Sequence, residues 1–216
     1  IISGLKLLKT QGIPTKLRIN VDLDNYNKIP YLLDDLIASN LGDLKLTFSV
    51  ISPMTHACSS YSSYMVDDKI IAQVIPRLWE TALKKGFKLD LKPLNSPTYC
   101  GSMTDSSFII DPTLAVYRCY GTVGDPQHII GHIVDGTLQK NYRYYDYMSR
   151  NPFTSAQYKD CQKCQLLPTC GGGCLLASWM KYGTYHKPVC GYLTNVLHER
   201  IKFYLKYEYP EKFHQE

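Results

Sequence analysis

The stretch "CQKCQLLPTCGGGC", residues 161–174, places four cysteines within fourteen residues, with three consecutive glycines before the last of them. Three more cysteines lie around it, at positions 100, 119 and 190. Thiols at this density form disulfides, bind zinc or hold iron–sulfur clusters. Each use implies a different fold for the surrounding chain, so this stretch decides how the second half of the sequence is interpreted.

The composition is that of an ordinary globular protein. Of the 216 residues, 44% are hydrophobic and 20% charged, which predicts one large domain or two small ones. An apolar run of about 18 residues and a secretory signal are both missing, so we expect a cytoplasmic protein without a membrane partner. The net charge of +5 is spread along the chain and predicts no nucleic acid partner. The first residue is Ile1, within a helical pattern, which indicates a fragment or a processed piece.

Residues 1–92 alternate between predicted strands and predicted helices. Period-two patterns indicate strands at 17–22, 44–51 and 87–92, and apolar residues at helical spacing indicate helices at 28–40 and about 68–85. Strands joined by long crossovers of this kind form βαβ units with a parallel sheet. We therefore expect an α/β unit over residues 1–93.

The predicted strands are polar on one face, whereas strands covered on both faces of a parallel sheet are almost wholly apolar. The polar set is Arg18, Asn20, Asp22, Lys45, Thr47, Ser49, Lys88, Asp90 and Lys92. The apolar set is Leu17, Ile19, Val21, Leu44, Leu46, Phe48, Leu89 and Leu91. Two interpretations stay open: half of a (β/α) barrel with a wet lumen, or a mixed sheet with one solvated face.

The character of the sequence changes after Pro93, and a second domain over residues 94–216 is predicted there. Seven of the eight cysteines lie beyond this point. The segment "SFIIDPTLAVYRC" predicts a β-hairpin that turns at Asp111, Pro112 and Thr113. An amphipathic helix over 191–207 ends the domain. The tyrosine-rich stretch 141–151, Trp79 and Trp179 are interpreted as packing residues.

The cysteine spacing argues against two of the three uses of a thiol. Disulfides need an oxidising compartment, which nothing in the sequence indicates. Structural zinc sites show two CxxC pairs, or one CxxC with paired histidines, whereas here one CxxC is followed by spacings of five, three and fifteen. Seven thiols are too many for one tetrahedral metal ion and come close to the number of ligands that two clusters require. Gly171–Gly173 would let the backbone come close to inorganic sulfide.

The cysteine order resembles the seven-cysteine SPASM domain at the C-terminus of radical S-adenosylmethionine (radical SAM) enzymes. The matching pattern is Cys100, x18, Cys119, a gap of 41, Cx2Cx5Cx3C and Cys190. Leu114 stands where the family has a glycine between the first two cysteines. The resemblance implies a partial (β/α) barrel half over 1–93, followed by a small, irregular α+β SPASM domain over 94–216.

The resemblance also implies two auxiliary [4Fe–4S] clusters with interleaved ligands. The first would be held by Cys100, Cys119 and Cys174, and the second by Cys161, Cys164, Cys170 and Cys190. Some members have an eighth cysteine before the first, which "KPLNSPTY" (92–99) lacks, so the first cluster is expected to keep one open iron. Cys58 is either its fourth ligand or a reduced loop thiol.

The function implied is modification of a ribosomally made peptide or protein by an oxidoreductase. In such enzymes SAM is cleaved at a third [4Fe–4S] cluster, a radical takes hydrogen from the peptide, and the auxiliary clusters accept the electron or anchor the substrate. An electron donor such as flavodoxin or ferredoxin is the remaining partner. The CxxxCxxC motif of the SAM-cleaving cluster is absent, so the fragment is expected to be inactive alone. The alternative is a non-catalytic iron–sulfur or zinc module for electron transfer or structure.

Catalytic residues cannot be assigned from the sequence, although some site residues can be weighed. Arg18, Asn20 and Asp22 are candidates for binding the methionine moiety of SAM; the alternative is that they line a wet lumen or pair across strands. Tyr120 follows the second SPASM cysteine, where sulfatase-maturing members have an acidic base, which argues against that role. His128 and His132 show no metal-binding partner motif and are not expected to be ligands.

Overall fold

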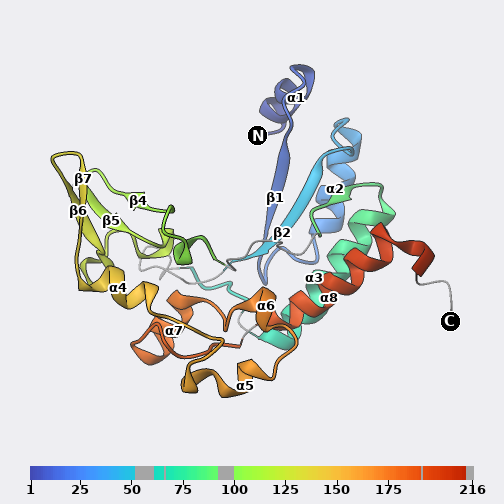
Figure 1. The fold of residues 1–216 in the computed structure, drawn as a ribbon. Coiled ribbons are helices and arrows are strands. Elements are labelled where there is room, and N and C mark those ends of the chain that lie inside the picture. The colour runs from blue at the N-terminus through green and yellow to red at the C-terminus, as the bar shows by residue number, and fades with distance from the viewer. Residues whose placement is uncertain (52–60, 66, 92–99, 191, 213–216) are drawn as a thin grey trace. The chain divides into compact units, whose positions relative to one another are not determined.

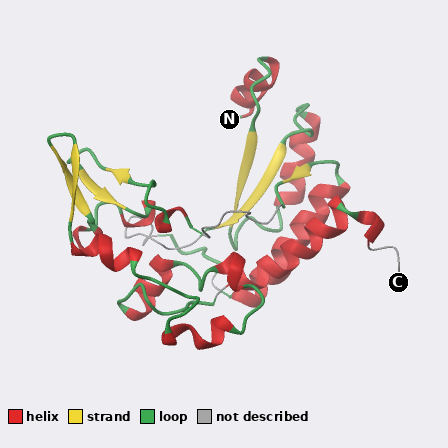
Figure 2. Ribbon diagram, viewed as in Figure 1, coloured by secondary structure: helices red, strands yellow, loops and turns green. Residues whose placement is uncertain are grey.

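The computed structural model describes residues 1–51, 61–65, 67–91, 100–190 and 192–212 (Figure 1). Two compact units are present. The first comprises the described residues of 1–93 together with those from Asn195 onward, and the second comprises those of 94–194. Each unit has its own sheet and its own helices (Figure 2), and each is described by itself.

The first unit is built on a three-stranded parallel sheet. Its strands are β1 (Lys16–Val21), β2 (Lys45–Val50) and β3 (Lys88–Leu89), in the order β1-β2-β3. The three strands begin in register, because Lys16 pairs with Lys45 and Lys45 with Lys88. The parallel pairing of the three predicted strands is confirmed. The third strand is shorter than predicted, because β3 covers only two of the described residues in the predicted range 87–92. The described strands do not close into a barrel.

Helices cover the apolar face of this sheet. The helices of this unit are α1 (Ile2–Thr10), which precedes β1, and α2 (Ile29–Ala38), α3 (Asp68–Lys84) and α8 (Tyr192–Glu208). Figure 1 shows α2, α3 and α8 on the same side of β1 and β2. Ile19 and Val21 of β1 and Leu46 of β2 are buried, as are Leu33 of α2 and Ile71 of α3. Burial of these side chains holds the strands and helices together.

The opposite face of the sheet is polar, as the alternation predicts. Lys16, Arg18 and Asn20 of β1 are exposed. Asp90, just after β3, accepts a hydrogen bond from Lys16 and lies 3.3 Å from the ammonium of Lys45, so one carboxylate ties together the starts of β1 and β2. Lys16 lowers the pKa of Asp90 most, with Lys45 adding to the effect, and desolvation opposes them.

The C-terminal helix differs from the prediction, because α8 belongs to the first unit and not to the cysteine-rich one. The Phe203 ring meets the Trp79 ring of α3 edge to face, with 5.6 Å between the ring centroids. The Arg200 guanidinium donates to the carbonyls of Asp90 (2.8 Å) and Leu91 (3.0 Å) at the end of the β3 segment. The prediction counts this helix with the cysteine-rich domain, whereas the contacts group it from Asn195 onward with the first unit. An amphipathic pattern indicates that a helix has a partner without saying which one.

The second unit contains a four-stranded antiparallel sheet, β4 (Ile109–Ile110), β5 (Ala115–Tyr117), β6 (Gly131–Val134) and β7 (Thr137–Lys140), in that order. The predicted hairpin at 111–113 is confirmed, and the Asp111 carboxylate accepts the Thr113 (2.8 Å) and Ala115 (3.0 Å) backbone N–H groups across its turn. Leu114 has φ of 64°, a left-handed conformation that favours glycine. This geometry gives a physical reason for the glycine that the family pattern carries there.

The helices of the second unit are short. They are α4 (Tyr142–Met148), α5 (Lys159–Gln162), α6 (Leu167–Cys170) and α7 (Leu175–Tyr182). Single 3₁₀ turns lie at η2 (Gly101–Met103), η3 (Tyr120–Thr122), η4 (Pro126–His128) and η5 (Ala156–Tyr158), and η6 (Pro210–Lys212) follows α8 in the first unit. None of the described helices is both long and apolar enough to cross a membrane.

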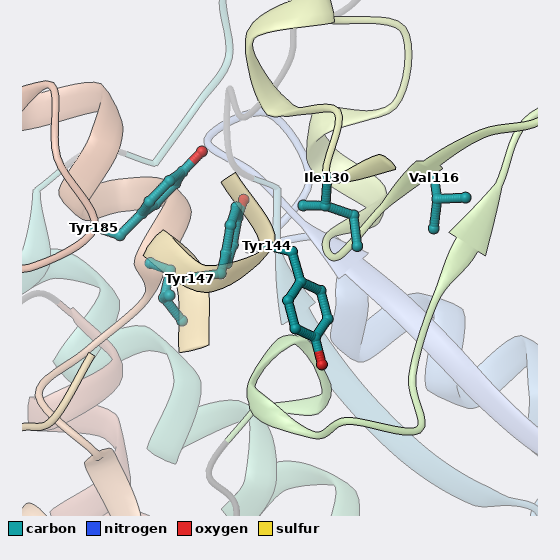
Figure 3. Packing of buried hydrophobic residues seen from close by; sticks show 6 residues of the cluster. Val116, Ile130, Tyr144, Tyr147 and Tyr185 are labelled. Carbon is teal, nitrogen blue, oxygen red and sulfur yellow. The ribbon is translucent and has the colours of Figure 1, made fainter. Parts of the chain in front are cut away.

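The core of the second unit is rich in tyrosine (Figure 3). Its buried members are Val116, Ile130, Tyr144, Tyr147, Leu175 and Tyr185. The Tyr147 and Tyr185 rings lie 4.0 Å apart between centroids, and the ring of Trp179 stacks on Tyr185 at 4.7 Å. In the tyrosine-rich stretch, Tyr144 and Tyr147 are core residues, as expected, whereas Tyr142 and Tyr145 are exposed.

Candidate metal centre

The seven cysteines of the second unit lie on its turns and helix ends, and none of them forms a disulfide. Cys100 and Cys119 directly precede the turns η2 and η3. Cys161 lies in α5, Cys170 ends α6 and Cys174 caps the start of α7. Cys164 and Cys190 are exposed, Cys161 is buried and the other four are half-buried. The thiols thus lie at turns and at the ends of short helices, where side chains from different segments can converge.

One set of thiols centres on Cys119. Burial raises the pKa of the Cys119 thiol, a backbone hydrogen bond from Gly121 opposes this, and the neighbouring thiols of Cys174 and Cys100 raise it further. Cys100 Sγ also lies 3.1 Å from Ser102 Oγ. Cys174 interacts with these upstream residues although Cys170 is only four positions away from it in the sequence. We call Cys100, Cys119 and Cys174 thiol set A.

A second set centres on Cys161. Burial raises the pKa of its thiol, and the thiols of Cys190, Cys170 and Cys164 raise it further in that order. Burial raises the pKa of Cys190 as well, and there the neighbouring thiols are Cys170 and Cys164. We call Cys161, Cys164, Cys170 and Cys190 thiol set B. No thiol of one set contributes to the pKa shifts found in the other.

The three glycines bring Cys190 to this site. Gly171 ends α6 in the left-handed conformation, and Gly172 and Gly173 follow with φ of 77° and 91°. The Val189 N–H donates to Gly172 O at 3.2 Å, and a Cβ on Gly173 would lie 2.1 Å from Val189 O. The glycines therefore allow the close approach of the loop segment that carries Cys190. At Gly173 the close contact is with protein backbone, and the predicted approach of these glycines to sulfide stays a prediction.

Arg150 is a buried cation beside set B that sequence reasoning missed. Its side chain is 4% exposed. Nε donates to Tyr158 Oη at 2.8 Å, and Nη2 donates to Gly173 O at 3.1 Å. Nη1 is buried and has no hydrogen-bond partner. The guanidinium lowers the pKa of the Cys161 thiol against the larger effect of burial. An isolated arginine in a tyrosine-rich segment follows no motif, so no sequence signal could have found it.

The donor set fits iron–sulfur clusters better than a single ion. Among the described residues, no three His, Cys, Asp or Glu side chains form a ready site for one metal ion. A zinc ion holds its thiolates at about 2.3 Å and thus within about 4 Å of each other. In a [4Fe–4S] cluster each thiolate binds a different iron, so the sulfurs stand farther apart. The thiols of each set interact electrostatically without forming a single-ion site. The buried Nη1 of Arg150 beside set B has no hydrogen-bond partner and could donate to a negatively charged group there.

The residues considered for SAM do not all face the same way. Arg18 Nε donates to Asn20 Oδ1 at 3.0 Å, and both border a cavity of about 340 Å³ shared with α1 and α2. Asp22 is buried, and its Oδ1 accepts the backbone N–H groups of Asp24 and Asn25, both at 2.9 Å. Its other oxygen accepts a hydrogen bond from the Tyr61 hydroxyl. Asp22 is therefore engaged in the loop after β1, and only Arg18 and Asn20 are brought together.

The other residues singled out from the sequence are placed as follows. Tyr120 is 77% exposed at the start of η3. His128 is buried in the aromatic core, where Nδ1 contacts the Tyr185 hydroxyl, and His132 lies on β6. Cys58 and the segment 92–99 lie outside the described residues.

No family model matches the chain, and no curated protein matches it either. Among solved structures, it is similar to "Native anSMEcpe with bound AdoMet", with a TM-score of 0.55, and to the same protein with bound AdoMet and Cp18Cys peptide, with a TM-score of 0.56. Both alignments cover 97% of this chain at 15% identity. The chain spans 58% and 59% of the length of those proteins. At this identity the similarity shows that the fold is shared.

Proposed function

We propose that this chain is the C-terminal part of a radical SAM/SPASM enzyme that modifies a ribosomally made peptide or protein. The observation that carries the proposal is the division of seven free thiols into sets A and B. The similarity in fold to anSMEcpe, a radical SAM/SPASM protein, supports a distant relationship to that group. In this proposal the first unit is half of the catalytic barrel and the second is the SPASM domain.

Sets A and B are the proposed ligands of two auxiliary [4Fe–4S] clusters. When bound, such clusters supply one-electron chemistry or an iron that anchors the substrate. The chain itself supplies thiolates at fixed positions. Burial and the neighbouring thiols raise the pKa of the Cys119, Cys161 and Cys190 thiols, so a bound iron, whose positive charge favours the thiolate, would be needed to deprotonate them together. Set A has three thiols, which leaves one iron of its cluster open to a substrate or to Cys58.

The proposed catalytic function requires SAM, a peptide substrate and an electron donor. The solved anSMEcpe structures contain AdoMet and, in one case, a peptide, which makes SAM and a peptide the proposed partners of the intact enzyme. Arg18 and Asn20 are the proposed contacts to SAM, and a flavodoxin or ferredoxin is the proposed electron donor in the cytoplasm. The sequence has no CxxxCxxC motif, so the proposal requires a segment that supplies one.

Metal analysis of the chain after anaerobic purification tests the cluster assignment. We expect a brown protein that absorbs at about 400 nm and binds about eight iron atoms with equal sulfide. Cys119→Ser and Cys164→Ser should each remove about half of the iron, while Cys58→Ser tests the eighth cysteine. A colourless protein with stoichiometric zinc would contradict the proposal. Iron–sulfur clusters combined with a coding sequence that lacks an upstream CxxxCxxC would instead support an electron-transfer module.

A further inference from the structure

Arg150 has a buried positive charge without a negative partner. Within the part of the chain that the structure describes, no carboxylate lies within salt-bridge distance of its guanidinium. Its two hydrogen bonds go to neutral oxygens, those of Tyr158 and Gly173. Burying an unpaired guanidinium is costly, since a charge loses its hydration and gains little from neutral acceptors. A buried cation of this kind indicates a negative group nearby that these contacts do not include.

The contacts of Arg150 place its charge at set B. Gly173 lies in the loop that brings Cys190 to the site, and Tyr158 packs with Cys161 in a small buried cluster. The Tyr158 hydroxyl also donates to Tyr185 O at 3.4 Å, which fixes the ring that holds the Arg150 side chain. The guanidinium carbon lies 5.3 Å from the centre of the Tyr158 ring. These contacts fix the guanidinium from two sides and leave Nη1 free to donate.

We propose that Arg150 raises the reduction potential of the cluster held by thiol set B by stabilising its reduced form. This inference rests on the proposed function, because it requires the cluster. A thiolate-bound cluster is negatively charged, and the gain of one electron from a low-potential donor increases that charge without a proton. A fixed buried cation favours the more negative state, and hydrogen bonds and nearby charge are known to set the potentials of such clusters. Arg150 is thus a positioning and charge-supplying residue and not an iron ligand.

The test is a dithionite titration of the reconstituted chain, followed by electron paramagnetic resonance, in which both clusters are measured. Arg150→Gln removes the charge and should disfavour reduction of the set B cluster at least tenfold, a shift of about 59 mV for a one-electron couple. The set A cluster serves as an internal control and should keep its potential. Arg143→Gln is the matched control: Arg143 stacks on Trp179 and Tyr185, and its charge is paired with the carboxylate of Asp146.

Arg150→Lys separates charge from packing. Lysine keeps the positive charge, so the reduction potential of the set B cluster should lie closer to wild type in Arg150→Lys than in Arg150→Gln. A purely structural role predicts the same change in both variants. If Arg150→Gln does not bind the set B cluster, the test rests on Arg150→Lys alone. A tenfold lower equilibrium constant for reduction of the cluster in Arg150→Lys then overturns the inference. Equal potentials in wild type and Arg150→Gln also overturn it. A wild-type chain without iron–sulfur clusters would refute the proposed function itself and this inference with it.

Discussion

Replacing Gly173 by alanine tests how the glycine loop builds thiol set B. Two costs are expected. An L-residue at φ of 91° is strained by about 1 kcal/mol. In addition, the new Cβ would lie 2.1 Å from Val189 O, whereas ordinary contact begins at 3.4 Å, so the Val189 backbone must move by about 1.3 Å. Overpacking of this kind costs about 1–3 kcal/mol, which gives about 2–4 kcal/mol in total.

Gly183→Ala is the matched control, because Gly183 has φ of 66° and its Cβ would meet no atom within 4 Å. It should cost only about 1 kcal/mol. Urea unfolding is followed by the fluorescence of Trp179 in a Trp79→Phe background, which reports on the second unit alone. The moved Val189 directly precedes Cys190, so Gly173→Ala should also lose about half of the bound iron, whereas Gly183→Ala keeps it. Equal stability and equal iron in the two variants would refute the role given to the loop.

Three further perturbations probe other parts of the chain. Arg200→Ala should destabilise the first unit by about 1.5–3 kcal/mol, because the carbonyls of Asp90 and Leu91 lose a charged donor. The control Lys202→Ala breaks only an exposed pair with Glu199 and should cost at most about 0.5 kcal/mol. Trp79 fluorescence during urea unfolding measures both changes. Leu114→Gly should stabilise the second unit by about 0.5–1 kcal/mol, since glycine relieves the left-handed backbone at the cost of more unfolded-state entropy, and a loss of stability would contradict the strain. Burial lowers the pKa of His128, so this histidine takes up a proton in the unfolded chain before it does in the folded one as the pH falls. The stability of the second unit should therefore be full above about pH 6.5 and decline below it. His128→Gln should flatten this decline in denaturation series between about pH 7 and 5.

The regular elements of the fold could be predicted from the sequence where one local pattern determines them. Alternation of polar and apolar residues placed the ends of β1 and β2 to within one residue, because successive side chains of a strand point to opposite faces of the sheet. The hairpin at Asp111 followed from its turn chemistry. The association of α8 with the first unit could not be predicted, since an apolar stripe fits any apolar partner.

The candidate site was predictable in composition and only partly in geometry. The thiols are recognisable because cysteines at such spacing have few uses, but the neighbours of Cys174 depend on how the chain folds back at the glycines. Asp22 shows the limit of a pattern: it continues the polar series of β1, yet the chain turns there and buries it among backbone N–H groups. Arg150 depends on tertiary contacts with Tyr158 and Gly173, which no spacing in the sequence encodes.

The most direct test of the central claim is the iron content of paired cysteine variants after anaerobic reconstitution. If Cys119 and Cys174 hold one cluster, the double variant Cys119→Ser/Cys174→Ser should lose no more iron than either single variant, about four atoms per chain. Cys170→Ser/Cys174→Ser combines one thiol from each set and should lose the iron of both clusters. If that second pair instead loses only as much as Cys170→Ser alone, the neighbouring cysteines of 161–174 share one site and the division into two clusters is wrong.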